Sequence, residues 1–252
     1  MNKINVSVVS YVNSLPFVQG LIQSEIMNSI SLSLDTPSVC AAKIISGQSD
    51  IGLLPVAVLP ELPFYHIISD FCIGTNSEAR SVLLISKSPL DRIYKVYLDK
   101  DSRTSVNLAK LLAIRLWHIS VEWVWTSDGF SIDDIQEGEA AVIIGDKALK
   151  FERKFPFQLD LAVEWKKLTG LPFVFAAWVS TKQLDDNFIK LFNKALAHGI
   201  KNIDAFVNLP SEKNVTIRDL KQYLTENINY HFDEEKKKAM NLYLSMLAET
   251  HL

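Results

Sequence analysis

The chain has 252 residues, of which 48% are hydrophobic and 22% charged, and its formal net charge is −3. This composition excludes disordered and fibrous proteins, and no segment approaches the roughly 20 apolar residues of a membrane-spanning helix. The length suits one large domain or two lobes of about 100 to 150 residues each, and we expect two lobes.

Basic residues do not gather in a pattern that favours nucleic acid. The only dense run, Lys236–Lys238, follows Asp233–Glu235 at helical spacing, so we interpret it as a solvated helix face. We therefore predict no nucleic-acid partner and no membrane partner. The sequence leaves the oligomeric state open.

Two features indicate a cytoplasmic location. The opening segment, residues 1–10, contains an apolar stretch that is too short and too polar for the hydrophobic region of a secretory signal. Cys40 and Cys72 have apolar neighbours and lack the close spacing of a metal or redox pair. We expect buried, reduced thiols rather than a disulfide.

The first ninety residues alternate short apolar runs with helical patterns, which is typical of βαβ units and a largely parallel sheet. We predict helices at 15–22 and from Pro37 to just before Gly47. The predicted strands of this part are 4–9, 31–34, 50–54, 65–73 and 81–86.

After Pro89 the pattern restarts as a second, smaller α/β unit. Its predicted elements are a strand at 95–98, a helix from Ser102 to about Trp117, a strand at 121–125, a short helix at 132–137 and a strand at 140–145. A long apolar run at 171–179 then predicts a strand that returns to the first unit. Three helices are expected to follow, at 185–206, 211–227 and 233–249.

One α/β domain inserted into another explains this order. We predict a two-lobed α/β fold in which residues 1–86 and 172–252 form lobe I and residues 87–171 form lobe II. Two hinge strands would join the lobes. Ligand would then bind in the cleft between them, where strand ends and interfaces leave concave, partly polar space.

Five places combine polar residues with a strand end or a helix start. The first loop contributes Ser10, Tyr11 and Asn13, which are also explained by a turn and a helix cap. Ser38 lies at the next helix start and is a candidate for substrate binding, although capping alone is the favoured explanation. The hydroxyl-bearing strand 81–86 contributes Ser86, whose hydroxyl faces either the cleft or solvent.

The strongest of these places is the helix start at Ser102, Arg103, Thr104 and Ser105. Three hydroxyls beside free backbone N–H groups suit a carboxylate or phosphate, and a single helix cap would explain only one of them. The last place holds Gly145, which permits close backbone approach, and Asp146, whose other interpretation is a helix cap. We expect substrate binding both by residues 102–105 and by Gly145 and Asp146.

Common catalytic arrangements do not coincide with these five places. The five histidines lie elsewhere in the sequence, so neither a metal site nor a Ser–His pair is indicated, and there is no P-loop or dinucleotide motif. Chemistry in the cleft would depend on hydroxyls, an amide and backbone dipoles.

Six short segments resemble, in chain order, the menaquinone-biosynthetic chorismate dehydratase family. Each segment is short, but their order and spacing make the resemblance specific, and it covers residues 4 to about 180. The segments are SYVNSLPF (10–17), DIGLLPVA (50–57), SVLLISKSPL (81–90), LDKDSRTS (98–105), AVIIGDKAL (141–149) and LTGLPFVFAAW (168–178).

This resemblance implies the fold of type II periplasmic solute-binding proteins and a lyase activity. Chorismate would lose water to give 3-[(1-carboxyvinyl)oxy]benzoate, the entry step of the futalosine route to menaquinone, without a metal or organic cofactor. Within the family pattern Asn13 is the expected catalytic residue, which orients the substrate or its leaving hydroxyl. The resemblance also implies that the enolpyruvyl carboxylate of the substrate takes the proton. At Glu78–Arg80 the chain is more charged than the family pattern, so the family's contacts with substrate at the rim of the cleft are not carried over to these residues.

Two other functions remain open at this point. The same fold serves non-catalytic proteins that capture small carboxylates, and it also serves the sister enzyme of the futalosine pathway, which takes a larger nucleoside-type substrate. The missing secretory signal disfavours the first, and the first-loop sequence disfavours the second.

Overall fold

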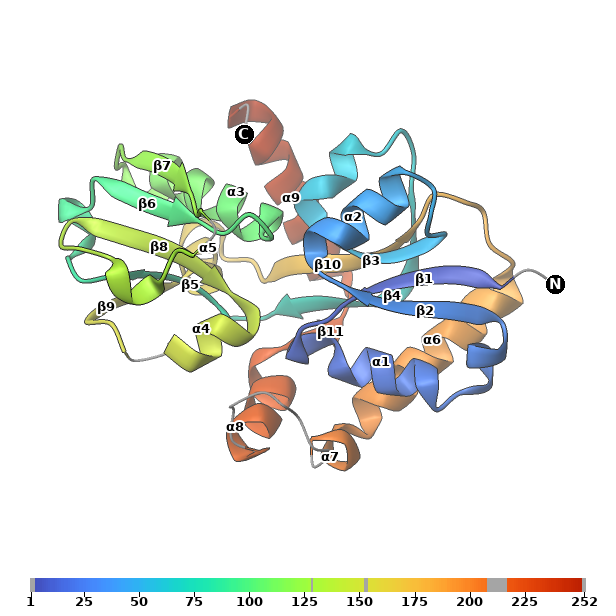
Figure 1. Cartoon of the computed structure of the whole chain (residues 1–252). Helices are drawn as coiled ribbons and strands as arrows, with labels where there is room; N and C mark the ends of the chain where they lie inside the picture. The colour runs from blue at the N-terminus through green and yellow to red at the C-terminus, as the bar shows by residue number, and fades with distance from the viewer. Residues whose placement is uncertain (1–2, 128, 152–153, 208–216, 251–252) are drawn as a thin grey trace.

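The computed structural model describes residues 3–127, 129–151, 154–207 and 217–250. Its backbone forms two mixed β-sheets that lie side by side, each with helices packed on it (Figure 1). The strand order is β11-β4-β10-β3-β1-β2 in the first sheet and β7-β6-β8-β5-β9 in the second.

The first sheet combines parallel and antiparallel pairs. β1 pairs in parallel with β2 and β3, whereas β10 runs antiparallel to both β3 and β4. The sequence pattern predicted a largely parallel sheet, because it does not show the direction of a returning strand. The strands are β1 (Ile4–Val9), β2 (Ile30–Asp35), β3 (Ile51–Pro55), β4 (His66–Thr75), β10 (Phe173–Ser180) and β11 (Asn229–His231).

In the second sheet, four of the described strands run in one direction and β5 runs against them. β6 pairs in parallel with β7 and β8, while β5 runs antiparallel to both β8 and β9. Its strands are β5 (Val82–Ser86), β6 (Lys95–Leu98), β7 (Glu122–Trp125), β8 (Glu139–Ile144) and β9 (Phe157–Asp160).

Helices cover both faces of the first sheet and connect the strands of the second. The α-helices are α1 (Leu15–Ile22), α2 (Pro37–Ile45), α3 (Arg103–Leu112), α4 (Gly145–Phe151), α5 (Leu161–Thr169), α6 (Asp186–Lys201), α7 (Ile203–Phe206), α8 (Ile217–Gln222) and α9 (Glu234–Thr250). Short 3-10 segments include η1 (Val12–Ser14) and η3 (Val56–Glu61), and π-helical turns extend α3 as η5 (Ala113–Trp117) and α8 as η7 (Tyr223–Asn227).

The chain passes between the sheets twice, after β4 and before β10. β5 belongs to the second sheet, so the expected boundary after residue 86 needs correction, and the first passage lies between Thr75 and Val82. The return lies between Thr169 and Phe173, close to the predicted position. Sequence patterns missed β9, α5 and β11, and the start of the predicted helix at 211–227 lies outside the described residues.

A shared hydrophobic core joins the two sheets. α9 lies between them and contacts α3, β10 and η3 (Figure 1). Trp165 of α5, Phe173 of β10 and Tyr243 of α9 pack edge to face with ring centroids 5.1–6.0 Å apart. Because these rings come from both parts of the chain, the two lobes are packed together and do not meet only at their connecting strands.

The pair Gly20 and Gly199 sets the distance between α1 and α6. A Cβ at Gly199 would lie 1.8 Å from the Pro16 carbonyl oxygen, and one at Gly20 would lie 2.2 Å from the Ala195 oxygen. Only residues without a side chain allow this approach. α1, which follows the first loop, is thereby held against the long helix α6.

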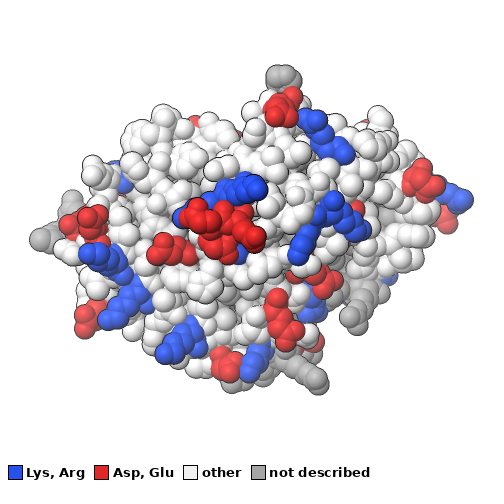
Figure 2. Space-filling view, turned by 180° about the vertical axis from the view of Figure 1, so that it is seen from behind, with Lys and Arg blue, Asp and Glu red and all other residues white. Residues whose placement is uncertain are grey.

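The lysine run of α9 is not a fully solvated face. Lys236 is fully buried, and its Nζ donates to Asp233 Oδ2 at 2.9 Å, whereas Lys237 and Lys238 are exposed as expected. The carboxylate partner and the helical spacing explain why a lysine is tolerated there. Elsewhere, basic and acidic side chains are interspersed, as the rear face shows (Figure 2).

Cys40 and Cys72 are free and buried, which confirms the prediction. Among the helices described, none combines the length and the apolar character that crossing a membrane requires.

Candidate functional site

A cavity with about 550 Å³ of empty space, part of it open to solvent, lies between the two sheets. The lining residues come from strand ends and helix starts of both sheets: Val9, Tyr11, Asn13, Ser14, Pro37, Leu53, Pro55, Ile73, Ser81, Val82, Asp101, Ser102, Arg103, Thr104, Ser105, Ile144, Gly145, Phe175 and Ala176.

Seven of the predicted site residues line this cavity, and four do not. The cavity brings together Tyr11, Asn13, Ser102, Arg103, Thr104, Ser105 and Gly145. The residues outside its lining are Ser10, Ser38, Ser86 and Asp146.

The start of α3 supplies hydrogen-bond donors. Ser102 and Ser105 are each only 4% exposed and line the cavity, and neither hydroxyl has a hydrogen-bond partner among the described residues. The Val106 N–H bonds to the Ser102 carbonyl at 3.1 Å, so the N–H groups before it belong to the first turn and lack helical partners. Two hydroxyls, free N–H groups and the positive end of the helix dipole together suit an anion.

Thr104 has a structural role that the sequence did not indicate. Its Oγ1 donates to the Phe175 carbonyl at 3.2 Å and accepts from the Ala57 N–H at 3.3 Å. The Tyr243 hydroxyl holds the Thr104 carbonyl at 2.8 Å. The expectation that the Thr104 hydroxyl donates to substrate is therefore corrected, because its single proton is already bonded.

Two contacts at the rim cross from one sheet to the other. Arg103, about half exposed, forms an ion pair with Glu61 of η3. Ser38 of α2 donates to Asp101 Oδ1 at 2.7 Å. Ser38 therefore acts on a lining residue without lining the cavity itself, and the part predicted for it as a direct ligand is corrected.

The first loop is clamped to the start of α4. Gly145 has a φ of +60°, and a Cβ there would lie 3.1–3.2 Å from atoms of the Tyr11 ring, so glycine is needed for both reasons. Asp146 Oδ1 accepts the Val12 N–H at 3.1 Å. Asp146 was predicted to bind substrate, but it does not line the cavity and instead fixes the first loop from outside.

Tyr11 lies in acidic surroundings. Burial, followed by the charges of Asp99, Asp101 and Asp146, raises the pKa of the Tyr11 hydroxyl well above its usual value. The phenol therefore stays protonated at neutral pH and is available as a donor.

Asn13 is held by two tyrosines from the C-terminal part of the chain. The Tyr230 hydroxyl donates to the Asn13 carbonyl oxygen at 2.9 Å. The Tyr223 hydroxyl donates to Ser81 Oγ at 2.8 Å, and the Asn13 side chain lies close enough to interact with the same hydroxyl. Asn13 and Ser81 both line the cavity, so this group of contacts forms a second polar part of its lining beside the hydroxyls of α3.

Ser86 and Ser10 lie elsewhere. Ser86 Oγ donates to the Glu139 carbonyl at 2.8 Å and accepts the Ser88 N–H at 3.0 Å. β5 runs antiparallel to β8, which puts Val82 beside Ile144 at the cavity and Ser86 at the far end of the strand. The binding role predicted for Ser86 is therefore corrected. Ser10 is exposed and lies outside the lining residues, and its binding role stays a prediction.

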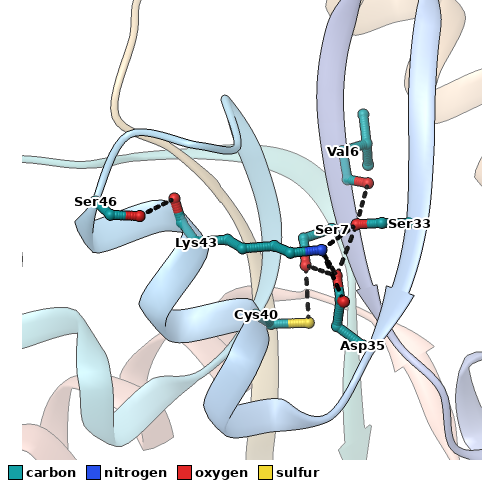
Figure 3. A network of polar contacts seen from close by, with 7 residues as sticks. All are labelled: Val6, Ser7, Ser33, Asp35, Cys40, Lys43 and Ser46. Atoms are coloured by element: carbon teal, nitrogen blue, oxygen red, sulfur yellow. Dashed lines mark hydrogen bonds and ion pairs between the residues drawn. The ribbon is translucent and has the colours of Figure 1, made fainter.

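A polar network behind the cavity fixes the turn into α2 (Figure 3). Asp35, the last residue of β2, accepts Lys43 Nζ on both oxygens at 2.7 Å, and Ser33 and Ser7 donate to its Oδ2 at 2.6 and 2.8 Å. Burial acts to raise the pKa of Asp35, but these hydrogen bonds outweigh it and lower the pKa below its usual value. The Ser7 hydroxyl also contacts the buried Cys40 sulfur at 3.1 Å, and burial raises the pKa of that thiol to about 11.

Comparison with known proteins then decides the family. The menaquinone biosynthesis family matches residues 4–249, nearly the whole chain. The chain belongs to this family. The match extends the resemblance seen in six segments through the C-terminal helices, which had offered no recognisable motif.

Two curated relatives of this family member carry the name chorismate dehydratase. The protein of Campylobacter jejuni is 35% identical over 114 residues, which cover 43% of this chain and about half, 48%, of the relative's length. The protein of Thermus thermophilus is 23% identical over 219 residues, covering 79% of this chain and 74% of the relative.

Solved structures confirm the expected periplasmic-binding-protein-like fold. A protein of Archaeoglobus fulgidus superposes with a TM-score of 0.79 at 14% identity, covering 99% of this chain and 98% of the other. The periplasmic aliphatic sulphonate binding protein of Escherichia coli superposes with a TM-score of 0.67 at 13% identity, covering 100% and 88%. At these identities the likeness concerns the fold alone.

Sequence reasoning missed several residues that shape the site of this family member. Ser81 belongs to the predicted strand 81–86, but Ser86 was the residue of that strand that was predicted to bind substrate. Tyr223 and Tyr230 lie about 210 residues after Asn13 in the chain, and nothing in their local pattern marks them. Only the pairing of β11 with β4 and the packing of η7 bring them to the first loop.

Proposed function

We propose that the protein is a chorismate dehydratase, a lyase that removes water from chorismate to give 3-[(1-carboxyvinyl)oxy]benzoate in the futalosine route to menaquinone. Membership of the menaquinone biosynthesis family and the names of two relatives support this. The observation that carries it is the cavity itself, which is lined by two unpartnered serine hydroxyls at the start of α3 and by Asn13 of the first loop. A cytoplasmic location belongs to the same proposal.

The reaction requires a proton to leave C3 and a hydroxyl to leave C4. The electron pair of the C3–H bond spreads through the adjacent double bond onto the ring carboxylate. It then forms the C3–C4 double bond as the C4–O bond breaks, which completes the aromatic ring. The departing hydroxide combines with the proton, so the balance is one chorismate to one product and one water.

The donors of α3 suit the charge that develops on the ring carboxylate. The Ser102 and Ser105 hydroxyls and the first-turn N–H groups are fixed before substrate arrives, so they stabilise negative charge without reorganising. Arg103 adds a positive charge at the rim, where it exchanges Glu61 for a substrate carboxylate. Ser102 and Ser105 are therefore the proposed binding residues, supported at the rim by Arg103.

Asn13 is the proposed catalytic residue in the second polar part of the lining. Its amide can donate to the departing C4 hydroxyl and keep it aligned, but an amide cannot accept a proton at neutral pH. The acidic groups among the described lining residues are Tyr11, which stays protonated, and Asp101, which accepts the Ser38 hydroxyl. The family resemblance supports the enolpyruvyl carboxylate of the substrate as the proposed proton acceptor, and the enzyme works by holding it near C3 and excluding water.

A second candidate function is capture of a small carboxylate without chemistry. The anion-binding start of α3 and the fold shared with the sulphonate binding protein favour it. Turnover distinguishes the two functions, since both predict binding.

The test compares wild-type protein with Asn13→Ala. Chorismate consumption is followed in the ultraviolet and by product mass, and thermal unfolding is measured in parallel. We expect turnover by the wild type, a loss of at least about 100-fold in the variant and nearly equal melting temperatures. Wild-type protein that is folded and binds chorismate without consuming it would leave the binding function, and a large drop in melting temperature would assign Asn13 to the turn instead.

A further inference from the structure

Tyr223 lies where the C-terminal part of the chain meets the cavity wall. It is 1% exposed and begins the π-helical turn η7, an irregular form that is often found at functional sites. Its hydroxyl donates to Ser81 Oγ at 2.8 Å, and the Asn13 side chain lies close enough to interact with the same oxygen. Tyr223 itself is not among the lining residues, so it acts on a ligand only through Asn13 and Ser81.

The protons in this group of contacts have a fixed direction. The single Tyr223 proton is donated to Ser81, so the Tyr223 oxygen can only accept from Asn13, and the amide must present its Nδ2. The Ser14 hydroxyl donates to Asn13 Oδ1 at 3.3 Å, which suits the same amide orientation. Ser81 Oγ then keeps its own proton, and the described residues provide no other acceptor for it, so it can be donated into the cavity.

We propose that Tyr223 is a positioning residue that sets the amide orientation of Asn13 and makes Ser81 a hydrogen-bond donor to the substrate. This inference rests on the proposed dehydratase function, because it concerns the orientation of the leaving hydroxyl and the group that binds it. Both consequences come from one hydroxyl on a buried ring that touches no ligand.

The backbone of the same loop is fixed separately. Tyr230 donates to the Asn13 carbonyl, so the loop keeps its place when the Tyr223 hydroxyl is removed. Replacing Tyr223 by Phe also keeps the ring in the core. The change therefore acts on side-chain orientation, and a large loss of folding is not expected.

The kinetic test uses Tyr223→Phe with Tyr97→Phe as a matched control. The Tyr97 hydroxyl likewise donates to another side chain, Glu139, at 3.1 Å, but Tyr97 lies outside the cavity lining. In Tyr223→Phe we expect kcat for chorismate to fall about 10- to 100-fold, with KM changed less than about threefold. The control should keep wild-type kcat. In an Asn13→Ala background, Tyr223→Phe should lower kcat by a smaller factor than in the wild type, because only the effect through Ser81 remains, whereas a purely structural role would add its full loss.

A spectroscopic test does not depend on turnover. The side-chain amide resonances of Asn13 are assigned by their absence in Asn13→Ala and then followed in Tyr223→Phe. We expect one resolved, slowly exchanging pair in the wild type and a shifted, faster-exchanging pair in the variant. If Tyr223→Phe does not fold, Ser81→Ala breaks the same hydrogen bond from the other side and should shift these resonances and lower kcat in the same range.

The outcomes separate the inference from the function on which it rests. Wild-type protein without turnover overturns the dehydratase proposal, and the resonances still decide whether Tyr223 orients Asn13. Unchanged kcat together with unchanged Asn13 resonances in Tyr223→Phe overturns the positioning role while leaving the function in place.

Discussion

Substitution of Gly145 by Ala separates backbone strain from the contact that holds the first loop. Gly145 has a φ of +60°, and its added Cβ would lie 3.1–3.2 Å from three atoms of the Tyr11 ring. Gly170, with a φ of +74° and no atom within 4 Å of an added Cβ, is the matched control. Both alanines adopt a left-handed conformation, which costs about 1–2 kcal/mol.

Only Gly145→Ala also displaces Tyr11. Carbon atoms in contact prefer about 3.5–4.0 Å, so the ring must move by roughly 0.5 Å, and Tyr11 lines the cavity. We expect both variants to lower the melting temperature by about 2–8 °C, since each kcal/mol corresponds to about 2–4 °C at this chain length. In addition, kcat/KM for chorismate should fall about 10- to 100-fold in Gly145→Ala alone.

Thermal unfolding and steady-state kinetics on both variants check this. Equal kcat/KM in the two variants would refute the reasoning, because the Tyr11 contact would then be irrelevant to the cavity. A much larger loss of stability in Gly145→Ala than in Gly170→Ala, with normal kinetics, would assign the contact to folding only.

Three further predictions follow from the contacts described. Ser102→Ala and Ser105→Ala should each lower kcat about 10- to 100-fold with little change in melting temperature, since neither hydroxyl has a described protein partner; normal kcat would remove them from the site. Ser86→Ala should lower stability and leave kcat unchanged, because the Ser86 hydroxyl makes two hydrogen bonds away from the cavity. We expect a loss of about 1 kcal/mol in urea unfolding. A fall in kcat would contradict the placement of Ser86 outside the cavity. The lowered pKa of Asp35 predicts a contribution to stability that is present above the unfolded value of 3.8 and is lost as pH falls through the folded value. Asp35→Asn should therefore cost about 1–3 kcal/mol at pH 7 and less near pH 3 in urea unfolding, and an equal cost at both pH values would show that the Lys43 pairing is unimportant.

Local sequence patterns predicted most elements that position the cavity, because the signals are local. Pro55 ends β3 as expected, since a proline cannot donate to the ladder, and α1 has the predicted bounds 15–22. The start of α3 was recognised from three adjacent hydroxyls at a helix start, and two of those hydroxyls are in fact free at the cavity. The sequence could not show that the Thr104 hydroxyl, unlike those of Ser102 and Ser105, is already hydrogen-bonded, because its partners are backbone groups far away in the chain.

The errors concern tertiary relations. Ser86 was preferred to Ser81 because a run of residues does not show which end of a strand meets the cavity, and the antiparallel pairing of β5 with β8 decides it. Lys236 was expected in solvent because its neighbours are charged, yet the packing of α9 between the lobes buries it. Tyr223 reaches the site from about 210 residues beyond Asn13, which no local pattern encodes.

The most direct test of the central claim is the identity of the product after purified, folded protein is incubated with chorismate. Mass spectrometry and proton NMR are expected to show loss of one water and a benzoate ring that carries the carboxyvinyl ether at position 3. Chorismate recovered unchanged, from protein whose melting temperature it raises, would contradict the claim and identify the cavity as a binding site without chemistry.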